Sequence, residues 1–370
     1  MTKVCHITNV HPQRDVRIFE KECVSLANLG YEVHLVAPGE NCIANGVHIH
    51  GIGERPISRM VRMTKFARKA YEEAMKVDAA IYHFHDPELI PYGIKLKKQG
   101  KKVVFDSHEN ILDQFAEKEY IPKLLRVVLN CIFVSYLRHS CKKFDAIISV
   151  DPVICNKYKK LNPNTIMVKN YPQLEEIEYK KSTSKYICFA GGISRQWNHD
   201  VVINAIEAID DLKYVLCGSA DQEYLDYLQT LPGWRNVDYR GRVSHNKALE
   251  LLQGGLAGVA LCSYSRNTNG KLGTLGNTKL FEIMMCGIPV ICTDFEAWKQ
   301  IVEKGNAGYC IHPQCVDDLK KILLQLIRDE NVSISMGKNG KRMVKTLYNW
   351  AQEELVLKEL YESICRKEKS

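Results

Sequence analysis

The chain has 370 residues, of which 45% are hydrophobic, so two domains with real cores are expected and a disordered or single small domain is excluded. The net charge is +8. Residues 1–172 carry 26 Lys and Arg against 18 Asp and Glu, whereas residues 173–370 carry 25 of each. This asymmetry predicts an anionic partner for the N-terminal half.

The fourteen cysteines form no CxxC pair, and several lie in apolar stretches such as "KYICFAGG". We interpret them as reduced thiols of a cytoplasmic protein that pack as small hydrophobic residues. Cys310 and Cys315 are the nearest approach to a metal-binding pair, but their spacing is loose and no second pair accompanies them. No metal is therefore predicted. The longest apolar run, residues 127–137, is too short to span a bilayer.

Strands and helices alternate along the first half. Strands are predicted in "KVCHITNV", "YEVHLVAP", "AAIYHFHD", "KKVVFDSHE" and "DAIISVD". Helical periodicity fills the intervals, in "RDVRIFEKECVSLANLG", "PELIPYGIKLKKQG" and residues 118–143. This order is typical of a parallel sheet with crossover helices.

A second cycle of strands and helices starts near residue 185, after a polar segment that indicates a linker. We predict an α/β fold with two Rossmann-like doubly wound domains and a cleft between them. The expected domains are 1–172 with a returning C-terminal helix at about 350–370, and 173–349. Neither half shows a GxGxxG after its first strand, which disfavours a dehydrogenase.

Polar and charged side chains follow three predicted strands of the N-terminal half, where open α/β sheets bind ligands. These residues are His11, Arg14 and Arg17, then His85, Asp86 and Glu88, and finally His108 and Glu109. The alternatives are structural: helix capping by Asp15 beside surface arginines, capping by Asp86, and a His108 that only ends its strand.

"GNTKLFEIMMCGIPVICTD" at 276–294 is the most informative stretch of the C-terminal half. It predicts a short helix capped by Asn277 or Thr278, stopped by Gly-x-Pro and followed by a buried strand. Lys279 in the first helical turn opposes the helix dipole unless an anion binds there. Glu282 suits a ribose, whose hydroxyls a carboxylate accepts, or it is the solvent-facing residue of an amphipathic helix.

The segment "KLFEIMMCGIPVI" resembles the nucleotide-sugar-binding segment of GT-B glycosyltransferases close to glycosyltransferase family 4. "HPQRDVRIFEKECVSLANLGYEVHLVA", "HFHDPELIP" and "VVFDSHEN" are similar to segments of its bacterial surface-polysaccharide members. "YNWAQEELVLKELY" resembles the family's C-terminal helix. The resemblance covers nearly the whole chain.

The resemblance implies a role for individual residues. Glu282 would bind the ribose, Val243 the base, and the backbone of residues 277–280, which includes Leu280, the diphosphate. Gly191 and Gly192 would let the backbone approach a phosphate. His108 would contact the donor sugar near the bond that breaks, with Asp86 as an alternative catalytic group on the neighbouring strand end.

The chain departs from the family pattern at two places. Thr274 stands eight residues before Glu282, where the family often has an acid. Gly192 and Trp197 occupy the positions of a usual Arg and Lys. We expect Arg195 or Lys279 to supply the missing positive charge, since a leaving diphosphate needs a cation.

Two basic segments, 55–68 and 120–143, interleave Lys and Arg with apolar residues. This pattern suits an anionic membrane surface, although ordinary packed helices with extended basic side chains give it too. Nucleic acid is disfavoured because no binding motif accompanies the charge.

The predicted activity is transfer of a sugar from a nucleotide diphosphate sugar to a glycan or lipid-linked acceptor. The resemblance implies retention of configuration and no metal or other cofactor, and UDP is the commonest donor nucleotide of the family. The alternatives are a GT-B nucleotide-sugar epimerase and a non-catalytic nucleotide-sugar binder. The expected location is the cytoplasm, in solution or on the inner face of the cell membrane.

Overall fold

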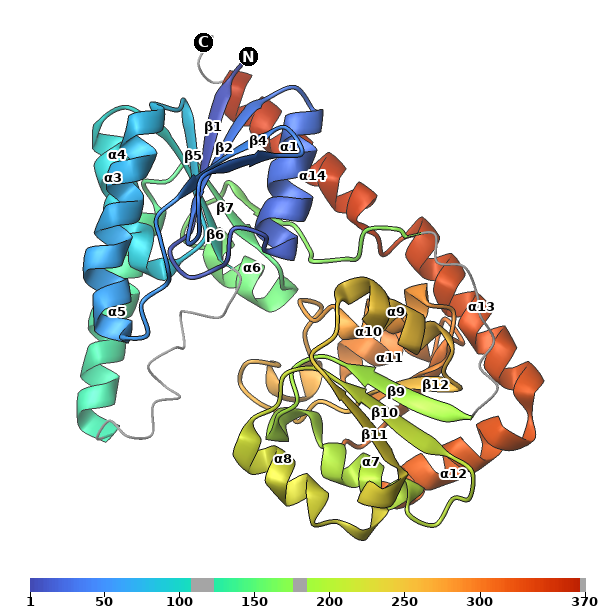
Figure 1. Ribbon diagram of the computed structural model, residues 1–370. Helices are drawn as coiled ribbons and strands as arrows, with labels where there is room; N and C mark the ends of the chain where they lie inside the picture. The colour runs from blue at the N-terminus through green and yellow to red at the C-terminus, as the bar shows by residue number, and fades with distance from the viewer. Residues whose placement is uncertain (108–122, 176–184, 367–370) are drawn as a thin grey trace. The chain divides into compact units, whose positions relative to one another are not determined.

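The structure is a computed structural model that describes residues 1–107, 123–175 and 185–366. The chain divides into two compact units (Figure 1). Unit 1 comprises Met1–Asn170 and Trp350–Ser370, and unit 2 comprises Tyr171–Asn349. The predicted residues His108 and Glu109 lie outside the described residues.

Unit 1 is built on a sheet whose eight described strands have the order β3-β4-β2-β1-β5-β6-β7-β8. All neighbours pair in parallel except β3 and β4. The order of the parallel strands reverses between β1 and β5. The strands are β1 (Lys3–Ile7), β2 (Glu32–Ala37), β3 (Cys42–Ala44), β4 (Val47–Gly51), β5 (Ile81–Phe84), β6 (Lys102–Ser107), β7 (Ala146–Ser149) and β8 (Thr165–Met167).

Helices cover both faces of this sheet. One face packs on α3 (Ala67–Val77), α4 (Ile90–Lys98), α5 (Lys123–Cys141) and α6 (Pro152–Lys159). The other packs on η1 (Val16–Cys23), α1 (Val24–Asn28) and α14 (Trp350–Arg366). Short segments join them: α2 (Arg59–Val61), η2 (Arg62–Phe66) and η3 (Pro87–Leu89).

Unit 2 has a parallel sheet whose six described strands have the order β11-β10-β9-β12-β13-β14. In chain order this is 3-2-1-4-5-6, the order typical of a Rossmann fold. The strands are β9 (Tyr186–Ala190), β10 (Lys213–Cys217), β11 (Val237–Gly241), β12 (Ala257–Ala260), β13 (Val290–Thr293) and β14 (Gly308–Ile311).

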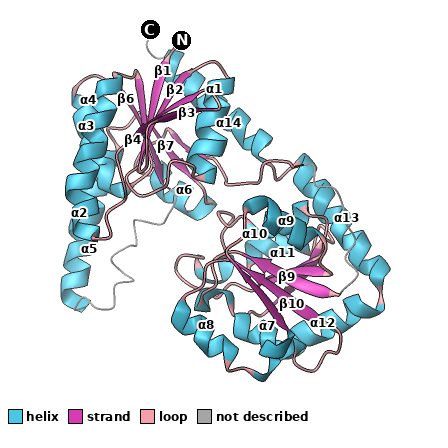
Figure 2. Ribbon diagram, in the orientation of Figure 1, coloured by secondary structure: helices cyan, strands magenta, loops and turns pink. Residues whose placement is uncertain are grey.

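The sheet of unit 2 is also covered on both faces (Figure 2). One face packs on α9 (His245–Gln253), α10 (Lys279–Met285), α11 (Glu296–Val302) and α13 (Glu330–Thr346). The other packs on α7 (His199–Ile206), α8 (Gln222–Gln229) and α12 (Val316–Arg328). The 3₁₀ segments are η5 (Arg195–Trp197), η6 (Pro232–Asn236) and η7 (Gly270–Leu272).

The predicted fold class is confirmed, including the return of the C-terminal helix to unit 1. The Trp350 indole donates to Ser25 Oγ at 2.9 Å, and Glu353 accepts from the Lys169 amide at 2.8 Å. The pattern missed β3, β4 and β8 and the helices α3 and α6 in unit 1, and the elements between β13 and α14 in unit 2. The first predicted helix is π-helical over Val16–Cys23 before it becomes α-helical, so its side-chain period differs from the one assumed.

Candidate active site

A cavity of about 320 Å³ lies at the carboxyl ends of β9, β10 and β11 in unit 2. Its size is within the range of small-molecule sites, about 300–1,000 Å³. Loops after the three strands form one side, and α9 and α10 form the other. The lining residues are Ala190, Gly191, Gly192, Cys217, Gly218, Ser219, Arg242, Val243, His245, Ala248, Leu249, Leu252, Lys279 and Glu282.

Two glycines let the backbone and a lysine pack closely at this edge. Gly218 has φ +143°, and a Cβ there would overlap the carbonyl oxygen of Gly191. A Cβ on Gly191 would lie 2.6 Å from Lys279 Cε. A Cβ on Gly192, by contrast, meets nothing within 4 Å. Gly218 therefore requires glycine, a side chain at Gly191 would displace Lys279, and Gly192 has room for a side chain.

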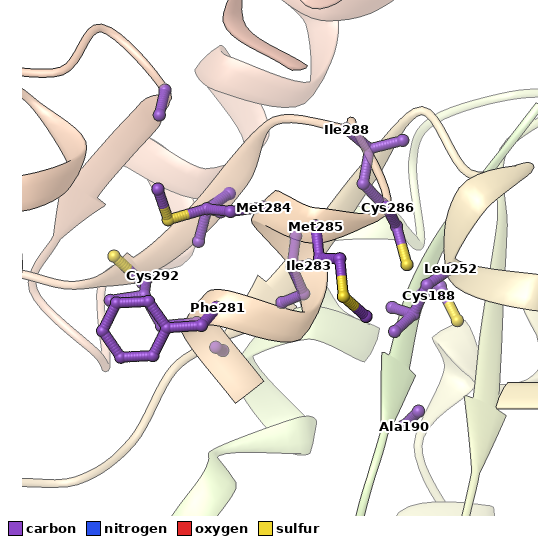
Figure 3. Close-up of a cluster of buried hydrophobic side chains, with 14 of the residues drawn as sticks. Cys188, Ala190, Leu252, Phe281, Ile283, Met284, Met285, Cys286, Ile288 and Cys292 are labelled. Carbon is purple, nitrogen blue, oxygen red and sulfur yellow. The ribbon is translucent and has the colours of Figure 1, made fainter. Parts of the chain in front are cut away.

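Lys279 and Glu282 enter the cavity from the first turn of α10. Lys279 Nζ lies 3.2 Å from Glu282 Oε2, and the two side chains are 25% and 15% exposed. The rest of the helix is fixed in the core by Leu280, Phe281 and Ile283–Met285 (Figure 3). Because the apolar face is buried, the two charged side chains have a defined position toward the cavity.

The carboxylate of Glu282 is held in its ionised form. Burial raises its pKa, but the charges of Lys279 and His245 and hydrogen bonds from Lys279 and Thr278 outweigh burial, so the pKa is lowered overall. At a pH above the ordinary pKa of a glutamate, Glu282 is therefore ionised and can accept hydrogen bonds from hydroxyl groups. The prediction of a solvent-facing Glu282 is wrong, since the residue is mostly buried at the cavity.

The helix start is partly occupied by its own cap. Asn277 Oδ1 accepts from the Lys279 amide at 2.9 Å, as predicted for a capping residue, and Thr278 makes no cap bond. Leu280 places its side chain in the core. Neither Asn277, Thr278 nor Leu280 is among the lining residues. Their backbone role toward a diphosphate stays a prediction.

Two lining residues, Arg242 and His245, were not predicted from the sequence. Arg242 immediately precedes Val243, the predicted base-contacting residue in "RGRVS", and both line the cavity. His245 opens α9 and lies 3.6 Å from Glu175 Oε1. In the sequence, Gly241 signals that a strand ends here. In the structure this glycine has φ +61°, the left-handed conformation typical of a turn.

Arg195 does not reach this cavity. Its guanidinium lies over the rings of Tyr224 and Tyr227, 5.1 and 5.4 Å from their centroids, and 3.7 Å from Glu223. The side chain is 64% exposed. The prediction that Arg195 compensates for the missing loop cation is therefore not supported by its position, whereas Lys279 and Arg242 both line the cavity.

In unit 1, Asp86 organises the loop after β1. Its Oδ2 accepts from Thr8 Oγ1 and from the Asn9 amide, both at 2.7 Å. His11 Nε2 lies 3.7 Å from Asp86 Oδ1, and His11 Nδ1 lies 3.2 Å from Asp15. Asp86 also occupies the N-cap position before Pro87, as the structural alternative predicted, but its side chain makes no cap bond and is used for the loop contacts instead.

The predicted acceptor-side residues fall into two groups. Arg14 is exposed and stacks on Phe19 with 4.6 Å to the ring centroid, and Glu88 lies 3.5 Å from Arg62. Arg17 on η1 and His85 after β5, however, are buried. Arg17 pairs with Asp106 at 3.0 Å, so neither Arg17 nor His85 is exposed to an acceptor. Asp15 caps η1 as the structural alternative predicted, but Arg17 beside it is not a surface residue.

No helix in the described ranges is long and apolar enough to cross a membrane. The cysteines are all free thiols, and Cys310 and Cys315 belong to no metal-like group in the described part of the chain.

The doubly wound sheets and the strand-end cavity define a GT-B-type α/β protein with a small-molecule site in unit 2. A family model described as "Glycosyl transferases group 1" matches residues 171–343, and one described as "Glycosyltransferase Family 4" matches residues 20–168. The chain belongs to these glycosyltransferases, as the sequence motifs predicted.

Curated relatives and solved structures agree with this assignment. Two uncharacterized glycosyltransferases of Methanocaldococcus jannaschii are similar: MJ1069 is 23% identical over 298 residues, 73% of this chain and 70% of the relative. MJ1178 is 24% identical over 230 residues, 62% of each chain.

Three solved structures share the fold. A sucrose-phosphate synthase from Thermosynechococcus elongatus has a TM-score of 0.77 at 15% identity, covering 99% of this chain and 100% of its own. WaaG, described as a glycosyltransferase involved in lipopolysaccharide biosynthesis, has 0.70 at 12%, covering 97% and 99%. Anabaena HepE in complex with UDP and glucose has 0.67 at 14%, covering 98% and 100%.

Proposed function

We propose that the chain transfers a sugar from a UDP-sugar to a glycan or lipid-linked acceptor in cell-surface polysaccharide synthesis. The observation that carries this proposal is the ionised Glu282 paired with Lys279 in a cavity at the strand ends of unit 2. The carboxylate can accept hydrogen bonds from the hydroxyls of a ribose, and the cation beside it can neutralise the attached diphosphate. HepE, one of the proteins of similar fold, is described in complexes with UDP and with UDP-glucose.

Each part of the donor has a candidate partner in this proposal. Glu282 accepts from the ribose hydroxyls, and Val243 contacts the base. The backbone of 277–280 and the loop at Gly191 and Gly192 face the diphosphate, which Lys279 and Arg242 neutralise. These cations and the amide groups take the place of a metal ion in stabilising the leaving diphosphate.

The transfer step breaks the bond between the anomeric carbon and the diphosphate oxygen and forms a bond from that carbon to an acceptor hydroxyl oxygen. The hydroxyl proton leaves toward a diphosphate oxygen or a basic side chain. In our proposal His108 is the acid–base group of this step, and Asp86 is the alternative base. The configuration at the anomeric carbon is retained, as in the families that the sequence resembles.

An exposed apolar surface in unit 1 supports a membrane-bound acceptor. Ile57, Met60, Leu124, Val127 and Ile132 are all at least half exposed, on α2 with its preceding loop and on α5. Basic side chains, including the exposed Arg59, lie among them in sequence. An apolar face with basic residues suits the inner leaflet of a membrane with anionic lipid, which would place the enzyme on the cytoplasmic surface.

The test is to incubate the full chain with a series of UDP-sugars, with and without membrane extract as acceptor. Transfer predicts released UDP that rises when acceptor is added. Conversion of the donor to its epimer without released UDP would instead support the isomerase alternative. Binding with neither product would leave the non-catalytic binder, and no binding of any UDP-sugar would refute the donor assignment.

A further inference from the structure

A compact group of imidazoles and one carboxylate lies in the core of unit 1. It consists of His6 on β1, His83 on β5, His85 directly after β5, and Glu22 on η1. Each offers one ligand atom, and these atoms all lie within 4.8 Å of one another. All four side chains are fully buried, with 0% exposure. This group, the histidine–glutamate cluster, has no part in the donor cavity of unit 2.

The distances within the cluster approach those of ligands around one metal ion. Glu22 Oε2 lies 4.0 Å from His6 Nδ1, 3.9 Å from His83 Nε2 and 4.0 Å from His85 Nε2. His6 Nδ1 and His85 Nε2 are 3.0 Å apart. Ligand atoms around tetrahedral Zn²⁺ lie about 3.3 Å apart, since its bonds are about 2.0–2.1 Å. Closing the set around one ion therefore requires the Glu22 carboxylate and the imidazoles to move inward.

A neighbouring tyrosine orients two of the three imidazoles. The Tyr361 hydroxyl lies 2.8 Å from His83 Nδ1 and 3.2 Å from His6 Nε2, and Asp106 Oδ2 lies 3.6 Å from His85 Nδ1. The phenol oxygen can accept N–H bonds from His83 Nδ1 and His6 Nε2, whereas the His85 Nδ1–Asp106 Oδ2 distance is longer than a hydrogen bond. With these tautomers the inner nitrogens of His83 and His6 carry lone pairs directed at the centre, which is the second-shell arrangement of metal-bound histidines.

With these tautomers the centre requires a cation. His6 Nδ1 and His85 Nε2 lie 3.0 Å apart, a hydrogen-bond distance whose donor depends on the tautomers, and when neither nitrogen carries its own hydrogen only a shared proton or a metal ion can lie between them. Neither His83 Nε2 nor the two carboxylate oxygens of Glu22 have a hydrogen-bond partner among the described residues. Arg17 lies 3.1 Å from Glu22 but also pairs with Asp106 at 3.0 Å, so its single charge is shared by two carboxylates. A proton or a metal ion can supply the remaining positive charge.

We propose that His6, His83, His85 and Glu22 bind one divalent transition-metal ion, with Zn²⁺ as the best match to a set of three nitrogens and one carboxylate oxygen. The site is closed, because all four ligands are fully buried and no coordination position faces solvent. The ion is therefore structural: it ties η1 to β1 and β5, the two strands between which the strand order reverses. This departs from the expectation that the protein binds no metal.

The experiment measures metal in the full chain. The protein is expressed in zinc-supplemented medium, and a second sample is unfolded with chelator and refolded with Zn²⁺ or Co²⁺, since a buried site fills during folding. We expect about one ion per chain, and for Co²⁺ the absorption of a tetrahedral complex. The melting temperature of the refolded sample should rise with metal.

Matched variants identify the ligands. His83→Gln should lose the ion, whereas His199→Gln should keep it. His199 is equally buried in unit 2, with its Nδ1 2.9 Å from a tyrosine hydroxyl, and belongs to no such cluster among the residues that the structure describes. Glu22→Gln should also lose the ion. If these variants fold poorly, Tyr361→Phe removes only a hydroxyl from the outer shell and should weaken metal binding about 10- to 100-fold.

Wild-type protein that holds no more metal than Glu22→Gln under both preparations would overturn the proposal, and the cluster would then be neutralised by a proton. Equal metal content in the His83 and His199 variants would also overturn it. Because the readouts are metal content, spectrum and melting temperature, a failure of the proposed transfer activity leaves this result unaffected.

Discussion

Replacement of Glu282 by Gln tests the donor site most directly. The change keeps the shape of the side chain but removes the negative charge that accepts from the ribose hydroxyls. Loss of two charge-assisted hydrogen bonds costs on the order of 2–4 kcal/mol. The dissociation constant for UDP should therefore rise about 30- to 900-fold.

The ion pair with Lys279 modifies this estimate. Lys279 Nζ lies 3.2 Å from Glu282 Oε2, so the substitution frees the ammonium group to approach the diphosphate more closely. The loss for UDP should then lie at the lower end of the range, and the double variant with Lys279→Ala should bind UDP more weakly than either single variant. The fold should survive, since a partly exposed pair contributes on the order of 1 kcal/mol.

Isothermal titration calorimetry with UDP measures these affinities. Glu250→Gln is the matched control, because Glu250 forms the same i,i+3 pair with Lys247, at 2.7 Å, on the exposed face of α9. It should leave UDP affinity unchanged. A Glu282→Gln protein that binds UDP as tightly as wild type, with an unchanged melting temperature, would show that the ribose does not bind at Glu282.

Four further predictions concern other parts of the chain. Gly192→Arg should raise UDP affinity and turnover, since a side chain at this position meets nothing within 4 Å and restores the usual family cation; an unchanged affinity would argue against a phosphate at this loop. His108→Ala should lower turnover about 10²- to 10⁴-fold while UDP still binds, as for a positioned acid–base group; near-normal turnover would move this role to another residue. Burial lowers the pKa of His199 to about 3. Below about pH 6.5 the unfolded chain takes up a proton that the folded chain does not, so unit 2 should lose up to about 1.4 kcal/mol of stability per pH unit. Chemical denaturation of His199→Gln should show a flatter dependence of stability on pH. Arg59→Gln should weaken binding to anionic vesicles and reduce the salt dependence of that binding. Leu124→Ala should weaken binding to anionic and neutral vesicles alike. Equal binding of both variants and wild type in a flotation assay would show that this surface does not bind membranes.

The cavity in unit 2, which we propose as the donor site, was largely predictable because the sequence motifs that form it are local. The capping Asn277, the apolar run after it and the Gly-x-Pro stop fix a short helix within one stretch of chain. Because the apolar side of that helix is buried, its charged residues must lie on the remaining side. Arg242 and His245 were not predicted as lining residues because only a strand-end turn precedes them. The sequence "RGRVS" does not show which of its side chains faces the cavity.

Unit 1 was harder to predict because polar residues at a strand end look alike whether they point outward or inward. His85 and Asp86 are adjacent, yet His85 lies among the buried imidazoles while Asp86 accepts from the loop after β1. One signal was available in the sequence: buried strands carry His6, His83 and Asp106 in apolar surroundings. Their partners Glu22 and Tyr361 come from distant segments, so only the folded chain brings the cluster together.

The alternation of strand side chains also links the buried cluster to the loops that we assign to the acceptor. On β1, His6 points into the cluster, and Thr8, two residues later, holds Asp86. Directly after the neighbouring strand β5, His85 belongs to the cluster and Asp86 follows it at once. Any movement of the two imidazoles is therefore passed through very few bonds to the Thr8–Asp86 contact. Rigid packing or a bound ion at the cluster would fix this loop before an acceptor arrives, which lowers the entropy cost of positioning its hydroxyl group.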